Sequence, residues 1–235
     1  DLPDGADPAQ YIPYYYGDSG EKIYVSFSAA VDGKLLYLDP GKTCSFEKRS
    51  VTFTDIATHW GREDVEFAAS RSIVDGVGGG LFDPNGTMTR AMFVTVLWRI
   101  AGCPAVSGGS AFTDVPAGQW YTSAVAWASV NGIVDGYGGG RFGPSDPITR
   151  EQLCAVILRF VQWSGLSLKA VKAAVTFADA AKIDTWAASA VSQCQTAGLV
   201  DGKNGNVFDP LGYATRAEAC AILHRMIVSL LGANA

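Results

Sequence analysis

The sequence predicts a mainly α fold of three helix–loop–helix repeats, closed into a pseudo-threefold assembly with a central three-helix bundle, plus a small N-terminal β segment. The main observation is one pattern that occurs three times along the chain. In every copy a tryptophan leads to Asp-Gly and then to an arginine, at intervals that are identical between copies. Self-similarity at a fixed period is typical of repeat architectures. The copies are Trp60, Asp75-Gly76, Arg90; Trp120, Asp135-Gly136, Arg150; and Trp186, Asp201-Gly202, Arg216.

Composition limits the classes of function. The formal net charge of -5 argues against a nucleic-acid partner, since such proteins usually carry a basic face. No apolar run reaches the roughly 18 residues of a membrane-spanning helix, so we expect no membrane insertion. Two histidines and no Cys-x-x-Cys pair predict no metal site and no cofactor. Cys154, Cys194 and Cys220 stand where other copies have Val or Ala, which predicts buried free thiols.

Residues 1–50 differ from the repeats. Ile23, Val25 and Phe27 alternate with polar or aromatic residues, and Asp32-Gly33 precedes a second apolar run at 35–38. This pattern predicts a β-hairpin or strand pair, or the end of an upstream domain. Two or three strands are marginal alone, so the segment should pack on the first repeat. Residues 4–20 are expected to be irregular.

The first helix of each repeat is expected just after the tryptophan. In the first copy Val65, Ala68, Ala69 and Ile73 share one face at helical spacing. In the other two copies a glycine falls where this helix should end, as a left-handed terminal residue often does. The tryptophans have two interpretations, as core anchors at the helix start or as exposed binding residues.

A glycine-rich loop follows, and it begins with Asp-Gly in every copy. Dense Gly and Asn predict tight turns with positive φ. The simplest role for the aspartate is in the turn or in a helix cap.

The second helix should begin at a threonine, because its hydroxyl can accept a bond from a free N–H of the first turn. Glu218 completes a capping box with Thr215, and Gln152 can do so in the second copy, whereas Met92 cannot in the first. Each second helix then carries a broad apolar stripe. The stripes are Phe93, Leu97, Ile100, Ala101; Leu153, Ile157, Phe160, Val161; and Ala219, Leu223, Met226, Ile227.

The predicted units are residues 51–102, 111–165 and 176–231. A two-helix unit cannot cover its own apolar stripe, so neighbours must do so. An open solenoid and a closed cluster are both possible. We predict closure, because the outer copies are no more polar than the middle one. The linker after the second unit is expected to hold a short helix at 167–174.

Residues 53 to about 230 resemble three consecutive S-layer homology domains. The matching text is Phe-Thr-Asp at 53–55 and 112–114, Phe-Ala-Asp at 177–179, then the tryptophan, Asp-Gly and Thr-Arg. The family's Thr-Arg-Ala-Glu is complete only at 215–218. The resemblance implies the pseudo-threefold assembly and an extracellular location at the cell wall. It also implies non-covalent anchoring to a secondary cell-wall polysaccharide, often pyruvylated, in grooves between repeats.

Four residue types of each repeat are candidates for binding that polysaccharide. A guanidinium group can hold a carboxylate by two parallel bonds, and a helix N-terminus favours an anion. A tryptophan offers a flat face to a sugar ring. The alternative for the arginines is structural, in ion pairs with Asp83 or Asp209, and with Asp146 in the middle copy. The candidates are Arg90, Arg150, Arg216, Trp60, Trp120, Trp186, Asp75, Asp135, Asp201, Thr89, Thr149 and Thr215.

Two other classes of function are considered. The repeats could be a protein–protein assembly module of a surface array, contacting other copies without glycan. An enzyme is not expected, because no paired-carboxylate pattern recurs and the glycine loops lack the Gly-Lys-Ser/Thr of a phosphate loop. We therefore predict no catalytic residues.

Overall fold

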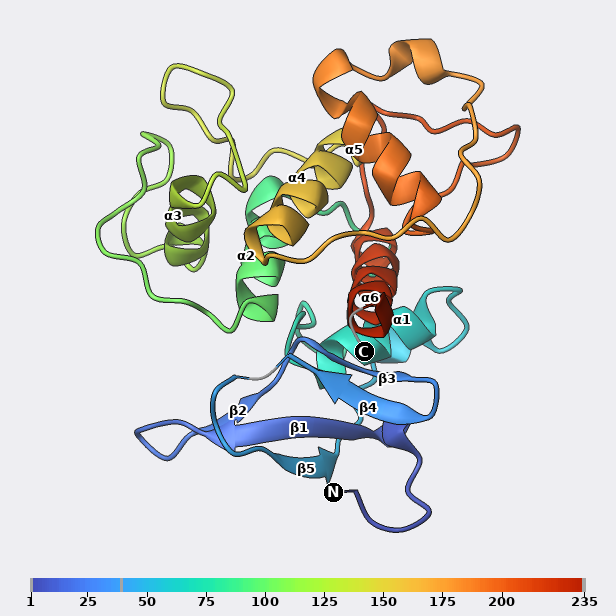
Figure 1. Ribbon diagram of the computed structural model, residues 1–235. Coiled ribbons are helices and arrows are strands. Elements are labelled where there is room, and N and C mark those ends of the chain that lie inside the picture. Colours follow the sequence, from blue (N-terminus) through green and yellow to red (C-terminus); the bar gives the residue numbers. More distant parts are fainter. Residues whose placement is uncertain (1, 39, 234–235) are drawn as a thin grey trace.

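The computed structural model describes residues 2–38 and 40–233, so positions 1 and 39 of the predicted N-terminal segment lie outside the described residues. Within that part of the chain the strands come first and the helices follow, which confirms the mainly α fold with a small β segment. Figure 1 shows the strands as a layer at one end of the molecule, with the helices stacked beyond it.

The strands form two small antiparallel sheets. One has the order β2-β1-β5, and the other is the hairpin β3–β4. The hairpin turns at Asp32 and Gly33, whose φ angles of 48° and 74° fit a type I′ turn. The strands are β1 (Tyr11–Tyr16), β2 (Lys22–Tyr24), β3 (Ser28–Val31), β4 (Lys34–Tyr37) and β5 (Ser45–Lys48).

The expectation of irregular backbone over 4–20 was wrong at β1. Tyr14 to Tyr16 pair with Tyr24 to Lys22, and Tyr11 to Tyr14 pair with Lys48 to Ser45. The strand is stabilised by pairing partners on both sides, and one of them, β5, is distant in the sequence. A local pattern of alternation does not report such distant pairing.

The β layer lies against the first repeat and also against α6 (Arg216–Ala233). Nε of Arg71 donates to the Ser28 oxygen at 2.6 Å, and the Ser26 hydroxyl donates to the Arg71 oxygen at 2.9 Å. The contact with α6 was not predicted. It arises because α6 is long enough to pass the repeats and reach the hairpin (Figure 1).

Each repeat contributes two helices, and the predicted apolar stripes of the second helices are buried except for half-buried Ala101. The first helices end near left-handed residues, Gly132 at φ 67° and Gly198 at φ 77°, with Ser72 at φ 58° in the first copy. The other helices are α1 (Arg62–Ser70), α2 (Arg90–Ile100), α3 (Thr122–Val130), α4 (Arg150–Trp163) and α5 (Thr185–Thr196), and 3₁₀ turns occupy Pro8–Gln10, Thr54–Ile56 and Ala180–Lys182.

Residues 167–174, all of them described, do not form the short helix that was expected there. The N–H groups of Val171 and Lys172 both donate to the Thr196 oxygen, at 2.9 and 3.1 Å. These two backbone N–H groups therefore donate to the C-terminus of α5 rather than within a helix of their own segment.

The repeats contact one another in a regular order. Helix α2 packs on α3, α4 on α5, and α6 on α1. The backbone N–H of Arg90 donates to the Asp146 oxygen, that of Arg150 to Gly212, and that of Arg216 to Gly86, each at 2.9 Å. The start of every second helix thus bonds to a turn of another repeat, and the third repeat bonds to the first.

The cysteines that replace Val or Ala are buried free thiols, as predicted. Burial raises the pKa of Cys220 to about 12, which fits an inert core residue. Cys103 is also a free thiol, but it is exposed.

Candidate ligand-binding grooves

The three repeat arginines are buried where the second helices begin, and each reaches into another repeat. Their Nε atoms donate to the backbone oxygen of a phenylalanine, at 2.8–2.9 Å. Their Nη2 atoms donate to the backbone oxygen of the Asp-Gly aspartate, at 2.8–3.1 Å. The partners are Phe142 and Asp135 for Arg90, Phe208 and Asp201 for Arg150, and Phe82 and Asp75 for Arg216.

The ion pairs proposed as the structural alternative do not form among the described residues. The carboxylate of Asp83 folds back over Gly86, and that of Asp209 over Gly212, so each stays within its own turn. Asp209 pairs with Lys203 and Asp146 with Arg141 instead. Burial lowers the pKa of Arg90 and of Arg216, and both remain cations because an arginine pKa starts far above neutrality.

An aspartate from the Phe-Thr-Asp motif fixes each accepting loop. Both carboxylate oxygens of Asp55 accept backbone N–H bonds, from Phe82 at 2.9 Å and Asp83 at 2.7 Å. Asp114 and Asp179 make the same pair of bonds in the other repeats. Burial opposes ionisation, but these bonds prevail and lower the pKa of all three carboxyls. Sequence reasoning missed this role, although the motif recurs.

The threonines are N-caps, as predicted. The hydroxyl oxygens of Thr89, Thr149 and Thr215 accept the N–H three residues on, at 3.2–3.3 Å. The capping box is complete in the second and third repeats and lost at Met92. Thr149 also lines a groove.

Three grooves lie beside the arginines, and each is lined by residues from all three repeats. Groove A holds Arg216, Asp75 and Trp120 and has a volume of about 350 Å³. Groove B holds Arg90, Asp135 and Trp186 and has about 500 Å³. Groove C holds Arg150, Asp201 and Trp60 and has about 200 Å³. Each groove therefore brings together one candidate Arg, one Asp and one Trp, and the three residues of a groove do not all come from the same repeat.

The tryptophans are exposed, so their interpretation as core anchors was wrong. Trp60, Trp120 and Trp186 are 63%, 58% and 51% exposed. The helix start is instead anchored by smaller residues, of which Val65, Ala124 and Ala187 are fully buried. An indole held at a groove with its face open to solvent is available to a ligand.

A second set of arginines lines the grooves and was missed by sequence reasoning. Arg99, Arg159 and Arg225 follow the first set at the same interval in every repeat, and this recurrence was a signal that could have found them. Arg99 pairs with the Asp75 carboxylate at 2.6 Å, and Arg159 with Asp135 at 2.8 Å.

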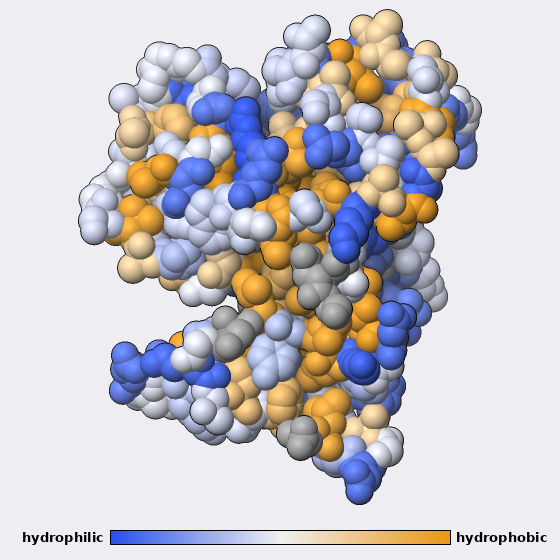
Figure 2. Space-filling view, viewed as in Figure 1, coloured by the Kyte–Doolittle hydropathy of each residue, from blue (hydrophilic) through white to orange (hydrophobic). Residues whose placement is uncertain are grey.

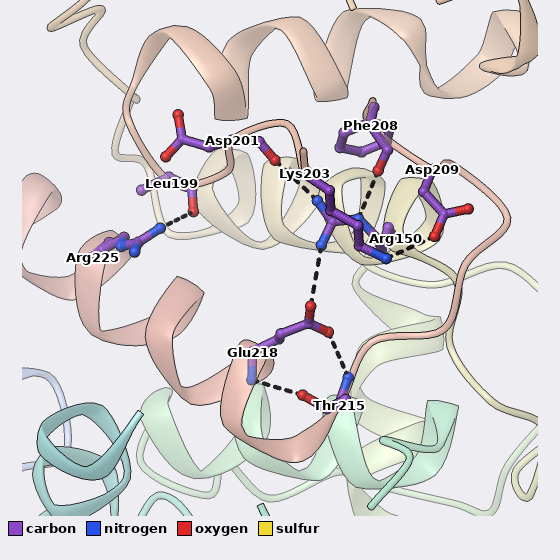
Figure 3. Close-up of polar contacts among 9 residues, drawn as sticks. All are labelled: Arg150, Leu199, Asp201, Lys203, Phe208, Asp209, Thr215, Glu218 and Arg225. Atoms are coloured by element: carbon purple, nitrogen blue, oxygen red, sulfur yellow. Dashed lines mark hydrogen bonds and ion pairs between the residues drawn. The ribbon is translucent and has the colours of Figure 1, made fainter. Parts of the chain in front are cut away.

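Figure 3 shows one arginine of each set at groove C, Arg150 from the second repeat and Arg225 from the third. Arg225 on α6 donates to the Leu199 oxygen at 3.3 Å. Nη1 of Arg150 on α4 is 3.7 Å from the Glu218 carboxylate. Asp201 pairs with Lys172 rather than with Arg225.

The visible surface of the helical part is mixed in character. Figure 2 shows hydrophilic and hydrophobic residues interspersed over the helical part of the visible face. The molecule is acidic as a whole, with a formal net charge of -5. Any attraction for an anion must therefore be local to the arginines and not a property of the whole surface.

Another cavity, of about 560 Å³, lies away from the three grooves, between the β layer and α1. Arg49 and Arg71 line it, but both donate to carbonyl oxygens at the end of α1, Ser70 and Phe67. Cations at a helix C-terminus are stabilising, so these arginines join the β layer to the repeats.

Among the described residues no group of three or more His, Cys, Asp or Glu side chains is arranged to hold a metal ion. No helix there has both the length and the apolar character needed to cross a bilayer.

The fold and the grooves define a module of three helix–loop–helix repeats whose surface hollows are shared between repeats. The chain belongs to the S-layer homology domain family, whose model matches residues 52–92, 111–154 and 176–220. The predicted resemblance is thereby confirmed. The chain is a cell-surface anchoring module with a cell-wall location, and domains of this family are not catalytic.

The relatives include enzymes and surface-layer proteins. The chain is 32% identical to an amylopullulanase of Thermoanaerobacterium thermosulfurigenes over 94% of its length, and 34% identical to Exoglucanase XynX of Acetivibrio thermocellus over 80%. It is 26% identical over 72% of its length to the surface-layer 125 kDa protein of Lysinibacillus sphaericus. The aligned part is only 12%, 17% and 14% of these proteins, so the enzymatic names describe much longer chains.

Proposed function

We propose that the three repeats hold an anionic cell-wall polysaccharide non-covalently in grooves A, B and C, and that the anion is a carboxylate such as a pyruvate ketal. One observation carries this proposal: each groove is lined by one exposed tryptophan and two arginines, and no two of these three residues come from the same repeat. The tryptophan offers a sugar-sized apolar face, and the arginines supply positive charge in a protein that is acidic as a whole.

The two sets of arginines have different parts in this proposal. Arg90 and Arg216 each donate hydrogen bonds from two nitrogen atoms to another repeat, and their Nη1 atoms have no hydrogen-bond partner among the residues that the structure describes. Arg99, Arg159 and Arg225 are more exposed and can move toward a ligand. A charged hydrogen bond contributes about 1.5–3 kcal/mol. One groove alone would then give affinity of roughly micromolar to millimolar order.

The same proposal includes the architecture implied by the family. We propose units at 51–102, 111–165 and 176–231, related by a pseudo-threefold axis with α2, α4 and α6 at the centre. The hydrogen bonds from each repeat to another, which return from the third to the first, support closure. Three grooves on one body raise the effective affinity for a repetitive polymer above that of one groove.

The test uses variants that leave the repeat contacts intact. Trp60, Trp120 and Trp186 are exposed, so changing all three to Ala should preserve the fold. The parent should co-sediment with purified cell-wall sacculi that carry the polysaccharide, whereas the triple variant should not. Trp163→Ala is the matched control, since Trp163 is also partly exposed but lines none of the three grooves. Equal sedimentation of parent and folded triple variant would contradict the proposal.

The assembly alternative has its own readout. Light scattering of the chain without glycan should show a monomer at micromolar concentration. A concentration-dependent oligomer that disappears in the same triple variant would favour contacts between copies instead.

A further inference from the structure

The three grooves differ in charge. Two arginines and one aspartate line groove A, and three cations and two acids line groove C, so each has a formal charge of +1. Groove B has two arginines against three acids, a formal charge of -1. The additional acids are Glu151 and Asp184.

These two carboxylates are unlike the other acids of the grooves, because they have no cationic partner among the described residues. Asp75 pairs with Arg99, Asp135 with Arg159 and Asp201 with Lys172, and Glu218 is 3.7 Å from Arg150. Glu151 Oε2 accepts only the Asp184 N–H, at 3.1 Å, and Asp184 Oδ2 accepts the Trp186 indole N–H, at 3.0 Å.

Glu151 is 1% exposed and lines groove B. Its Oε1 has no hydrogen bond within the described chain. Burial raises the pKa of its carboxyl, because a negative charge is poorly solvated at this position. A buried carboxylate without a cation is costly, and a positive group brought by a ligand would lower that cost.

The repeat does not require acids at these positions. Ala91 and Ala217 occupy the position of Glu151 in the other repeats, and Thr58 and Gly118 that of Asp184. The second helices begin in the same way in all three copies. The acids are therefore a property of groove B and not of the fold.

Groove B also has a second aromatic face. Tyr137 lines it together with Trp186, whereas Val77 and Lys203 occupy the position of Tyr137 in grooves A and C. Tyr137 is 47% exposed. The Tyr137 ring already has Arg90 and Arg141 over it, at 4.6 and 5.2 Å from its centroid, so the aromatic face open to a ligand cation beside the two carboxylates is that of Trp186.

We propose that groove B binds an amine-bearing, positively charged sugar residue, while grooves A and C bind the acidic residue of the polymer. This inference rests on the proposed function and assigns a distinct ligand class to one of its grooves. The ammonium group would lie against Glu151 and Asp184, with the sugar ring against the exposed face of Trp186.

The test is an NMR titration of the whole chain, in which the indole N–H signals of the groove tryptophans report binding. Each signal is assigned by its Trp→Phe variant. The amine probe is the β-1,4-linked glucosamine dimer, and its N,N′-diacetyl form is the neutral control. The glucosamine dimer should shift the Trp186 signal and bind about tenfold or more tightly than the diacetyl form.

Glu151→Gln keeps an acceptor for the Asp184 N–H, so it should fold, and it should remove most of that preference. Asp184→Asn is the second variant, with the same expected result. Glu63→Gln, an exposed acid on α1 outside groove B, should leave the preference unchanged. Equal affinity for both dimers at Trp186, or a preference that survives both variants, would overturn the inference.

A third probe distinguishes failure of the inference about groove B from failure of the proposed function. The methyl glucoside 4,6-pyruvyl ketal should shift the Trp60 and Trp120 signals. If it shifts neither, the proposed function is wrong. If it shifts both while the two dimers are not distinguished at Trp186, only the inference about groove B is wrong.

Discussion

The backbone oxygen of Asp75 accepts a hydrogen bond from Nη2 of Arg216 at 2.8 Å, although the two residues lie in the first and third repeats. The bond joins the ends of the repeat array. It also places a guanidinium group at the wall of groove A, beside an aspartate of one repeat and Trp120 of another. The same contact holds two structural units together and shapes the site between them.

Arg216 should therefore matter for stability as well as for binding. Arg216→Ala removes two charged hydrogen bonds and should cost about 2–4 kcal/mol of unfolding free energy. Arg216→Lys keeps the charge but cannot donate in the same fork, so it should lose part of that amount. Urea denaturation measures both. Arg62→Ala, which breaks an exposed pair with Glu66, should change stability by less than about 1 kcal/mol. If Arg216→Ala unfolds at the same urea concentration as the parent, the contact between repeats has little energetic weight.

The glycine of the Asp-Gly pair is required by close packing. A Cβ on Gly136 would lie 2.4 Å from the Arg141 oxygen and 2.7 Å from the Phe112 ring. Gly136→Ala should destabilise the protein by about 1–3 kcal/mol. Gly109→Ala is the control, because nothing lies within 4 Å of its added Cβ. Thermal unfolding should separate the two variants, and similar melting temperatures would refute the packing explanation.

Completing the missing capping box should stabilise the first repeat. Met92→Gln gives α2 the residue that closes the box on α4, where Thr149 N–H donates to Gln152 Oε1 at 3.3 Å. The expected gain is about 0.5–1 kcal/mol, since the N–H of Thr89 would acquire an acceptor. The measurement is the free energy of unfolding in urea. Met92→Leu, whose side chain offers no acceptor to the Thr89 N–H, should not show the gain, and an equal gain there would mean that the capping box is not its source.

Acid should weaken the loops that the Phe-Thr-Asp aspartates hold. Burial opposes ionisation of Asp114, but its two N–H bonds lower its pKa below the usual 3.8. A depressed folded pKa gives stability that is present above the unfolded pKa of about 3.9 and is lost as the pH falls through the folded value. Unfolding free energy should thus decline below about pH 4. Asp114→Asn should be less stable at pH 7 and should show a shallower decline, whereas an unchanged slope would place the acid sensitivity elsewhere.

Several features of the fold and site could be predicted from sequence because they depend on neighbours along the chain. Thr149 caps its own helix, Gly132 ends the preceding one, and the stripe from Leu153 to Val161 repeats at helical spacing. Each of these needs only a few consecutive residues. The S-layer homology family followed from the same local motifs, read in a fixed order.

The exposure of the tryptophans could not be predicted in this way. A tryptophan at a helix start can face inward or outward at equal spacing, and only the packing of Val65, Ala124 and Ala187 beneath the helices decides it. Strand β1 was missed for a similar reason, since its partners lie in other segments of the chain.

The three-fold repetition, the helix starts and the residue types available for a site can all be predicted from the sequence, because local backbone bonding and helical periodicity are encoded within short segments. The tertiary structure brings Arg216, Asp75 and Trp120 together in one groove and leaves Glu151 in another without a cationic partner among the described residues. These groupings depend on how one repeat docks on another. Docking brings together side chains that are far apart in the chain, and no spacing within a repeat specifies it.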